Sequence, residues 1–120
     1  MARIVLVDDD LSALEMMRRG LEADAHSVQA FGDSREALAV LSSDPTACEL
    51  LISDISMPDL DGISLVEAVL AVRPDLAVIL MSGLAGELRR AEALKSDRLR
   101  MVAKPVSLET IRSEVKAVLG

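Results

Sequence analysis

The chain has 120 residues, 51% of them hydrophobic, and a formal net charge of −7, which suits one packed domain and is the wrong sign for non-specific binding to a nucleic-acid backbone. No apolar stretch is long enough to span a membrane, no signal peptide is visible, and the single Cys48 cannot form an internal disulfide. We therefore expect one cytoplasmic domain over residues 1–120 that contacts neither nucleic acid nor membrane directly.

Five apolar runs of strand length recur along the chain. They show little polar alternation, which is typical of strands that are covered on both faces of a parallel sheet. In chain order the runs are RIVLV (3–7), a weaker SVQAF (27–31), LLIS (50–53), AVILM (77–81) and RMVA (100–103). We expect each run to form one strand.

Stretches with helical spacing of apolar residues separate and follow these runs. Most of them begin at residues that favour helix starts, namely Asp10, Asp33 with Ser34, Asp61 with Gly62, and Ser107. The stretch 84–98 is the least regular, because its apolar stripe is thin and Gly83 and Gly86 weaken its start. Strands alternating with helices predict an α/β fold with a doubly wound parallel sheet.

Polar residues follow four of the predicted strands where each strand ends. In doubly wound folds the ligand site lies off the carboxyl ends of the strands, at the switch in strand order. The residues that we expect to converge there are Asp8, Asp9, Asp54, Ser82 with Gly83, and Lys104.

The chemistry of this set favours phosphoryl transfer with Mg²⁺. Two carboxylates about 4 Å apart repel by about 4 kcal/mol at an effective dielectric constant near 20, and Mg²⁺ relieves that repulsion because it prefers carboxylate and phosphate oxygens. A carboxylate can attack phosphorus to form an acyl phosphate. A lysine ammonium and a hydroxyl donor stabilise the charge on the equatorial oxygens of the transition state.

The motifs around these residues resemble those of CheY-like receiver domains of two-component response regulators. They are VDDD (7–10), SDISMPDLDG (53–62), MSG (81–83) and AKPVSLETI (103–111). The resemblance covers essentially the whole chain and implies one receiver domain over residues 1–120. It also implies the CheY-like, or flavodoxin-like, strand order 2-1-3-4-5, with five helices in three layers.

The resemblance assigns Mg²⁺ ligands and a phosphoryl chemistry residue by residue. Asp9 and Asp54 would bind the ion directly, Asp8 would position metal-bound water, and the backbone carbonyl of Ser56 would complete the ligands. Asp54 would accept the phosphoryl group from a phosphohistidine on a sensor histidine kinase or a histidine phosphotransferase. The site residues that contact the phosphoryl group would be Ser82 and Lys104.

The resemblance also implies a switch in the surface formed by the fourth helix, the fifth strand and the fifth helix. Many family members have Tyr or Phe three residues before the lysine, but this chain has Met101 there. We therefore expect the switch to use a flexible loop that begins at Gly83 (83–86) and the helix behind it, with only partial coupling through Met101.

The output partner is predicted from a weaker similarity. The chain ends with the fifth predicted helix, so we expect a separate output protein. Residues 81–120 are similar to CpdR-type single-domain regulators, which act on a ClpXP protease, and this similarity predicts a protease-adaptor role.

Two other functions fit parts of the pattern. A haloacid-dehalogenase-type phosphatase would use Asp8 as nucleophile with Asp10, but it needs another acidic pair after Lys104, where only Glu109 and Glu114 remain. A phosphorylation-independent interaction domain would not need the full set of site residues. The receiver interpretation predicts a phosphoacceptor and not a conventional enzyme.

Overall fold

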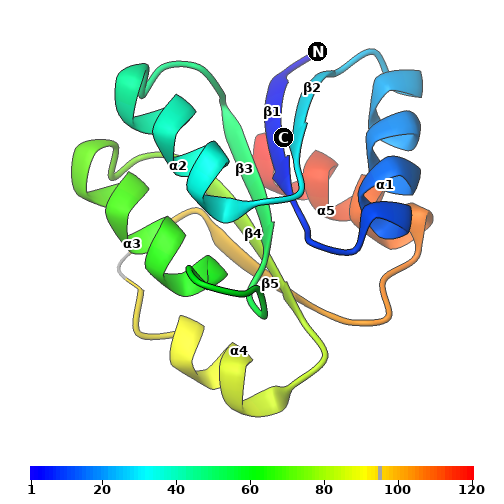
Figure 1. The fold of residues 1–120 in the computed structure, drawn as a ribbon. Coiled ribbons are helices and arrows are strands. Elements are labelled where there is room, and N and C mark those ends of the chain that lie inside the picture. The colour runs from blue at the N-terminus through cyan, green and yellow to red at the C-terminus, as the bar shows by residue number, and fades with distance from the viewer. Residues whose placement is uncertain (95) are drawn as a thin grey trace.

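Five parallel strands form one sheet in the computed structural model of the chain (Figure 1). The structure describes residues 1–94 and 96–120. In chain order the strands are β1 (Arg3–Val7), β2 (Ser27–Phe31), β3 (Leu50–Asp54), β4 (Ala77–Ser82) and β5 (Leu99–Ala103). Their order across the sheet is β2-β1-β3-β4-β5, which confirms the predicted doubly wound topology.

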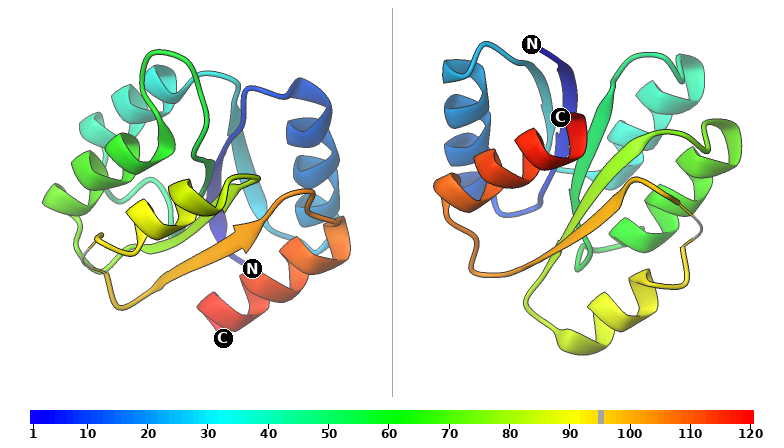
Figure 2. Two further views of the ribbon diagram at one scale, coloured as in Figure 1. Left: turned by 90° about the horizontal axis from the view of Figure 1, so that it is seen from below. Right: turned by 180° about the vertical axis from the view of Figure 1, so that it is seen from behind.

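Helices cover both faces of the sheet (Figures 1 and 2). They are α1 (Leu11–Ala23), α2 (Ser34–Ser43), α3 (Gly62–Val72), α4 (Ala85–Ala91) and α5 (Leu108–Leu119). Helices α1 and α5 pack on one face, and α2, α3 and α4 pack on the other. Among the described residues, no helix combines the length and hydropathy that crossing a membrane requires.

The strand side chains divide between two aliphatic cores, one on each face of the sheet. In β1, for example, Ile4 and Leu6 face α1 and α5, whereas Val5 and Val7 face α2 and α3. Both sets are buried because helices cover both faces. This arrangement explains why the strands read as continuous apolar runs and not as alternating ones.

Capping side chains fix where four of the helices begin. The predicted cap residues each accept a hydrogen bond from a backbone N–H of the first turn, and they are Asp10, Asp33, Asp61 and Ser107. These bonds satisfy donors that the helix itself leaves unpaired. The four helices therefore begin close to the ends of the preceding strands, either directly or after a short loop.

Helix α4 differs most from the prediction. It spans Ala85–Ala91, well short of the predicted stretch 84–98, and Lys95 within that stretch lies outside the described residues. The prediction of a loop over 83–86 is wrong for its second half, because Ala85 and Gly86 belong to the helix. Only Ala91 of α4 is buried, so the sequence carries no clear apolar stripe for this helix.

Candidate functional site

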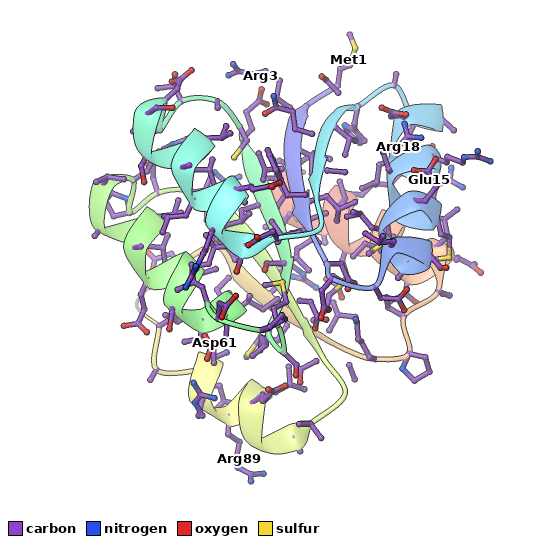
Figure 3. All side chains as sticks on the ribbon, in the orientation of Figure 1. Met1, Arg3, Glu15, Arg18, Asp61 and Arg89 are labelled. Atoms are coloured by element: carbon purple, nitrogen blue, oxygen red, sulfur yellow. The ribbon has the colours of Figure 1, made fainter. Side chains whose placement is uncertain are left out.

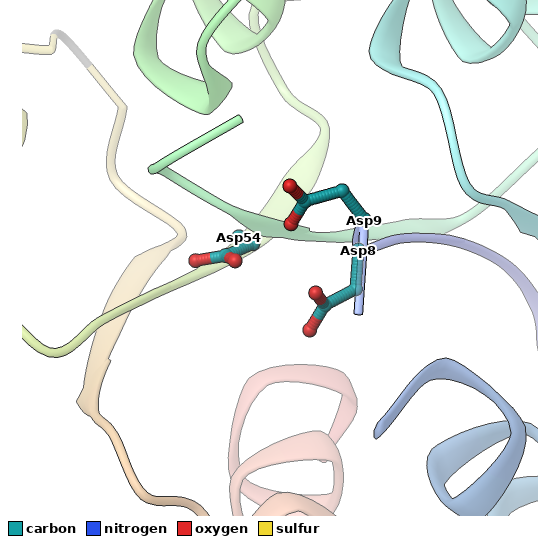
Figure 4. Close-up of side chains that lie close together, drawn as sticks. All are labelled: Asp8, Asp9 and Asp54. Atoms are coloured by element: carbon teal, nitrogen blue, oxygen red, sulfur yellow. The ribbon is translucent and has the colours of Figure 1, made fainter. Parts of the chain in front are cut away.

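The strand register brings the predicted polar residues to one edge of the sheet. Val7 of β1 pairs with Ser53 of β3, so the next residues, Asp8 and Asp54, lie side by side at the ends of these strands. The Asp8, Asp9 and Asp54 carboxylates each offer an oxygen within 4.8 Å of the others (Figure 4). The expected convergence of the three acids is therefore confirmed.

Lys104 lies between two of these carboxylates. Its Nζ is 3.1 Å from Asp8 Oδ2 and 3.0 Å from Asp54 Oδ2. Asp8 is fully buried and Asp54 is 5% exposed, whereas Asp9 is exposed to solvent. The other Asp8 oxygen, Oδ1, accepts a hydrogen bond of 2.9 Å from the backbone N–H of Asp10. The Lys104 ammonium thus stabilises a pair of acids that water barely reaches.

The charges of the site shift the pKa values of Asp54 and Lys104. Burial raises the pKa of the Asp54 carboxyl above its ordinary value, the hydrogen bond from Lys104 opposes that rise, and the negative charges of Asp8 and Asp9 add to it. Burial alone would lower the pKa of Lys104, but its hydrogen bond to Asp54 and the charge of Asp8 together raise it. A second cation would therefore lower the electrostatic cost of keeping all three acids charged.

Ser82 ends β4 with its hydroxyl turned toward the following loop. The side chain is 1% exposed, and Ser82 pairs with Ala103 of β5, the residue before Lys104. Its Oγ accepts a hydrogen bond of 3.0 Å from the backbone N–H of Leu84 and donates to the carboxylate of Glu87. The hydrogen bonds of this hydroxyl therefore join it to α4 and to the loop before α4, and not to the acids.

The remaining predicted residues lie around this edge. Ser56 is exposed on the loop two residues after Asp54, and the role of its carbonyl stays a prediction. Gly83 is exposed and follows Ser82. Met101 is half-buried in β5 and packs on the side of the sheet that carries α4.

Two residues of the site have roles that the sequence analysis did not predict. Gly62, the first residue of α3, lies so close to β3 that a Cβ built on it would be 2.1 Å from the Asp54 carbonyl oxygen. The carboxylate of Glu87 accepts a hydrogen bond from the Ser82 hydroxyl. In the sequence, Asp61 and Gly62 indicated a helix start and belonged to the SDISMPDLDG motif, but neither pattern predicted the close approach to Asp54, and no motif marked Glu87.

The phosphatase alternative requires a different use of the acids after β1. Asp10 Oδ1 accepts hydrogen bonds from the backbone N–H groups of Ser12 and Ala13, which makes Asp10 the cap of α1. Asp8 is fully buried and its Oδ1 accepts a hydrogen bond from the backbone N–H of Asp10, whereas Asp54 is partly accessible. These contacts favour Asp54 over Asp8 as the reactive carboxylate.

The donor set of the site fits Mg²⁺. The three clustered carboxylates are hard oxygen donors, and the exposure of Asp9 leaves a route for an ion that keeps part of its water shell. Cys48 and His26, the softer ligand types, are absent from the cluster. The cluster therefore has the chemistry of a magnesium site.

Comparison with known proteins identifies relatives of the chain. A family model described as the response regulator receiver domain matches residues 4–116. The C4-dicarboxylate transport transcriptional regulatory protein DctD of Rhizobium meliloti is 34% identical over 90% of this chain and 23% of its own length. The response regulator MprA of Mycolicibacterium vanbaalenii is 30% identical over 98% of this chain and 50% of its own length. The chain thus spans half or less of these relatives.

A solved structure supports the same assignment. The CheY-like response regulator receiver domain protein of Methanospirillum hungatei superposes with a TM-score of 0.89 at 26% identity, over 99% of this chain and 94% of that one. Together with the match over residues 4–116, this similarity means that the chain belongs to the response regulator receiver domain family of two-component systems.

Proposed function

We propose that this chain is a phosphorylation-dependent receiver, a single domain over residues 1–120 that accepts a phosphoryl group on Asp54. The observation that carries the proposal is the arrangement around Asp54, whose carboxylate lies at the end of a central strand with the Lys104 ammonium 3.0 Å away. Asp8 and Asp9 complete an acidic cluster with Asp54. Receiver family membership supports the same chemistry.

The proposed reaction transfers phosphorus from nitrogen to oxygen. An Asp54 carboxylate oxygen attacks the phosphorus of a phosphohistidine on a kinase or phosphotransferase. The N–P bond breaks, its electron pair returns to the imidazole nitrogen, and that nitrogen takes a proton from solvent. The product is an acyl phosphate on Asp54. Lys104 Nζ and the Ser82 hydroxyl supply charge and a hydrogen bond to the phosphoryl oxygens.

Asp9 and Asp54 would hold a Mg²⁺ ion directly, with Asp8 and the Ser56 carbonyl completing its surroundings. The ion supplies positive charge that lets an anionic phosphoryl donor approach the anionic Asp54. The chain's own part is to keep these acids close and charged, and Lys104 does so by bridging Asp8 and Asp54.

Adding Mg²⁺ is expected to stabilise the protein. At a hundred times its dissociation constant, the ion should raise the free energy of unfolding by about 2.7 kcal/mol. Asp9→Ala should remove most of that gain at little cost to the fold, because Asp9 is exposed. Urea unfolding with and without Mg²⁺ measures both effects.

Glu67→Ala is the matched control, since it removes one exposed acid from the middle of α3. It should keep the full Mg²⁺ gain. A wild-type midpoint that does not move with Mg²⁺ would show that the proposed ion site is wrong.

Incubation with acetyl phosphate and Mg²⁺ is expected to add one acid-labile phosphoryl group at Asp54. Intact-mass spectrometry counts the groups, and borohydride trapping followed by peptide mapping locates the residue. Asp54→Asn should take up none. Asp10→Asn should behave like the wild type, because Asp10 only caps α1 and asparagine caps a helix about as well. A label mapped to Asp8 would support the phosphatase alternative instead.

The output of the switch is proposed to pass through α4, β5 and α5. Gly83 and the first turn of α4 follow Ser82 directly, and Met101 packs on the same side of the sheet as Leu88 of α4. The proposed partner is a separate output protein, and the CpdR-type similarity suggests a ClpXP-type protease. A pull-down that compares wild type with Asp54→Ala would identify a partner that depends on phosphorylation.

A further inference from the structure

The Ser82 hydroxyl has more acceptors within reach than protons to donate. Its Oγ lies within hydrogen-bond distance of the Glu87 carboxylate and 3.3 Å from the Leu84 carbonyl oxygen. A serine hydroxyl has one proton, so it donates to one acceptor at a time. A carboxylate is a stronger acceptor than a peptide carbonyl, so the Ser82 hydroxyl donates its hydrogen bond to Glu87.

Helix α4 has fewer other attachments than the remaining helices, so it depends more strongly on the hydrogen bond between Ser82 and Glu87. Its N-cap residue, Leu84, has no capping side chain, and Ala91 is its only buried residue. Among the described residues, the other side-chain hydrogen bond of α4 is an exposed ion pair of 3.3 Å between Arg90 and Asp61, at the start of α3. Exposed ion pairs contribute little to stability. In Figure 3, Asp61 lies where α3 starts, close to α4, whereas Arg89 extends away from the site. Among the described residues, the side-chain hydrogen bond that joins the first turn of α4 to the sheet is therefore the one from Ser82 to Glu87, beside the apolar contact of Leu88 with the core.

We propose that Glu87 is a positioning residue that opposes activation by accepting the one hydrogen bond that the Ser82 hydroxyl can donate. This inference rests on the proposed function, in which that hydroxyl donates to the phosphoryl group on Asp54. Because the hydroxyl cannot donate to both acceptors, phosphorylation and the Ser82–Glu87 bond exclude each other. Formation of the acyl phosphate releases Glu87, and the first turn of α4 loses this hydrogen bond to β4.

The competition makes Glu87 the residue that sets the balance between the two states. A ligand shifts a two-state equilibrium only by its difference in affinity for the two states. Removing the Glu87 carboxylate weakens the unphosphorylated state alone, because the phosphorylated state does not use this bond. A Glu87 variant should therefore bind a phosphoryl mimic more tightly than the wild type does.

The test measures binding of beryllofluoride, a phosphoryl mimic, to the full chain in the presence of Mg²⁺. Glu87→Ala should bind about tenfold more tightly than wild type, the effect of losing one charge-assisted hydrogen bond in the competing state. Glu87→Gln, which keeps the size of the side chain, should lie between the two. Without beryllofluoride, backbone amide signals of residues 82–90 in Glu87→Ala should move toward their positions in the saturated wild type.

Two controls separate this mechanism from a general effect of charge. Glu92→Ala removes an exposed acid at the other end of α4 and should leave the affinity unchanged. In a Ser82→Ala background, Glu87→Ala should gain nothing, because no hydroxyl remains to be released. A gain that persists in that background, or equal affinities of Glu87→Ala and wild type, overturns the role of Glu87 while Asp54 phosphorylation stands. A wild type that takes up no phosphoryl group at Asp54 overturns both proposals.

Discussion

Lys104→Met is expected to slow phosphorylation of Asp54 by acetyl phosphate about 100- to 1,000-fold, the usual effect of removing one group that stabilises transition-state charge. Methionine keeps the length and the apolar stem of the side chain but removes the ammonium that lies 3.0 Å from Asp54 Oδ2. Lys104→Arg should recover part of the rate, because it keeps the charge but changes its geometry. Intact-mass spectra over time give the rate constants.

The same substitution should also destabilise the protein when Mg²⁺ is absent. Without Lys104, the buried Asp8 and Asp54 carboxylates face each other unpaired, and we expect a loss of about 3 kcal/mol in the free energy of unfolding. This value is at the low end for a buried ion pair because the Lys104 side chain is 24% exposed. Since the two acids then repel more strongly, the stability gain on adding Mg²⁺ should be larger than in the wild type.

Lys116→Met provides a control with the same change in charge, since Lys116 is exposed on α5. It should leave both the rate and the stability near the wild-type values. If Lys104→Met is phosphorylated within about threefold of the wild-type rate, Lys104 does not stabilise the transferring phosphoryl group, and its role reduces to pairing the acids.

The convergence of the acids could be predicted because it depends only on where strands end. Once RIVLV and LLIS are recognised as parallel strands, the residues after them must share one edge of the sheet. The apolar runs alone stop one residue short of these strand ends, because Asp54 and Ser82 are the last residues of β3 and β4 and still pair with the neighbouring strands. These two site residues therefore have the rigidity of the sheet.

The contacts around α4 could not be predicted from the pattern. A helix with one buried residue has almost no apolar period to detect. The bond between Ser82 and Glu87 depends on the path of the two residues between β4 and α4, and that path is set by tertiary packing. Gly62 is a similar case, because its closeness to Asp54 depends on how α3 docks against β3. The missed features are those that depend on distances between elements.

Gly62→Ala is expected to lower the free energy of unfolding by about 3 kcal/mol or more, at the upper end of the range for overpacking a core. The added Cβ would lie 2.1 Å from the Asp54 carbonyl oxygen and 2.9 Å from the Cα of Ile55. Both are backbone atoms of a fully buried central segment, so no flexible side chain can move aside. The backbone N–H of Gly62 also donates to the Ile55 carbonyl oxygen at 2.9 Å, which holds α3 in place.

Relief of this clash must move either α3 or the end of β3 that carries Asp54. Where the end of β3 moves, the folded protein should also be phosphorylated more slowly, because Asp54 then no longer faces Lys104 at hydrogen-bond distance. Gly83→Ala is the matched control: it is exposed, its φ is not positive, and its added Cβ would meet nothing closer than 3.9 Å. It should change stability by less than about 0.5 kcal/mol. Urea unfolding of the two variants at one Mg²⁺ concentration provides the comparison. Equal unfolding midpoints would mean that α3 does not pack tightly against the Asp54 backbone.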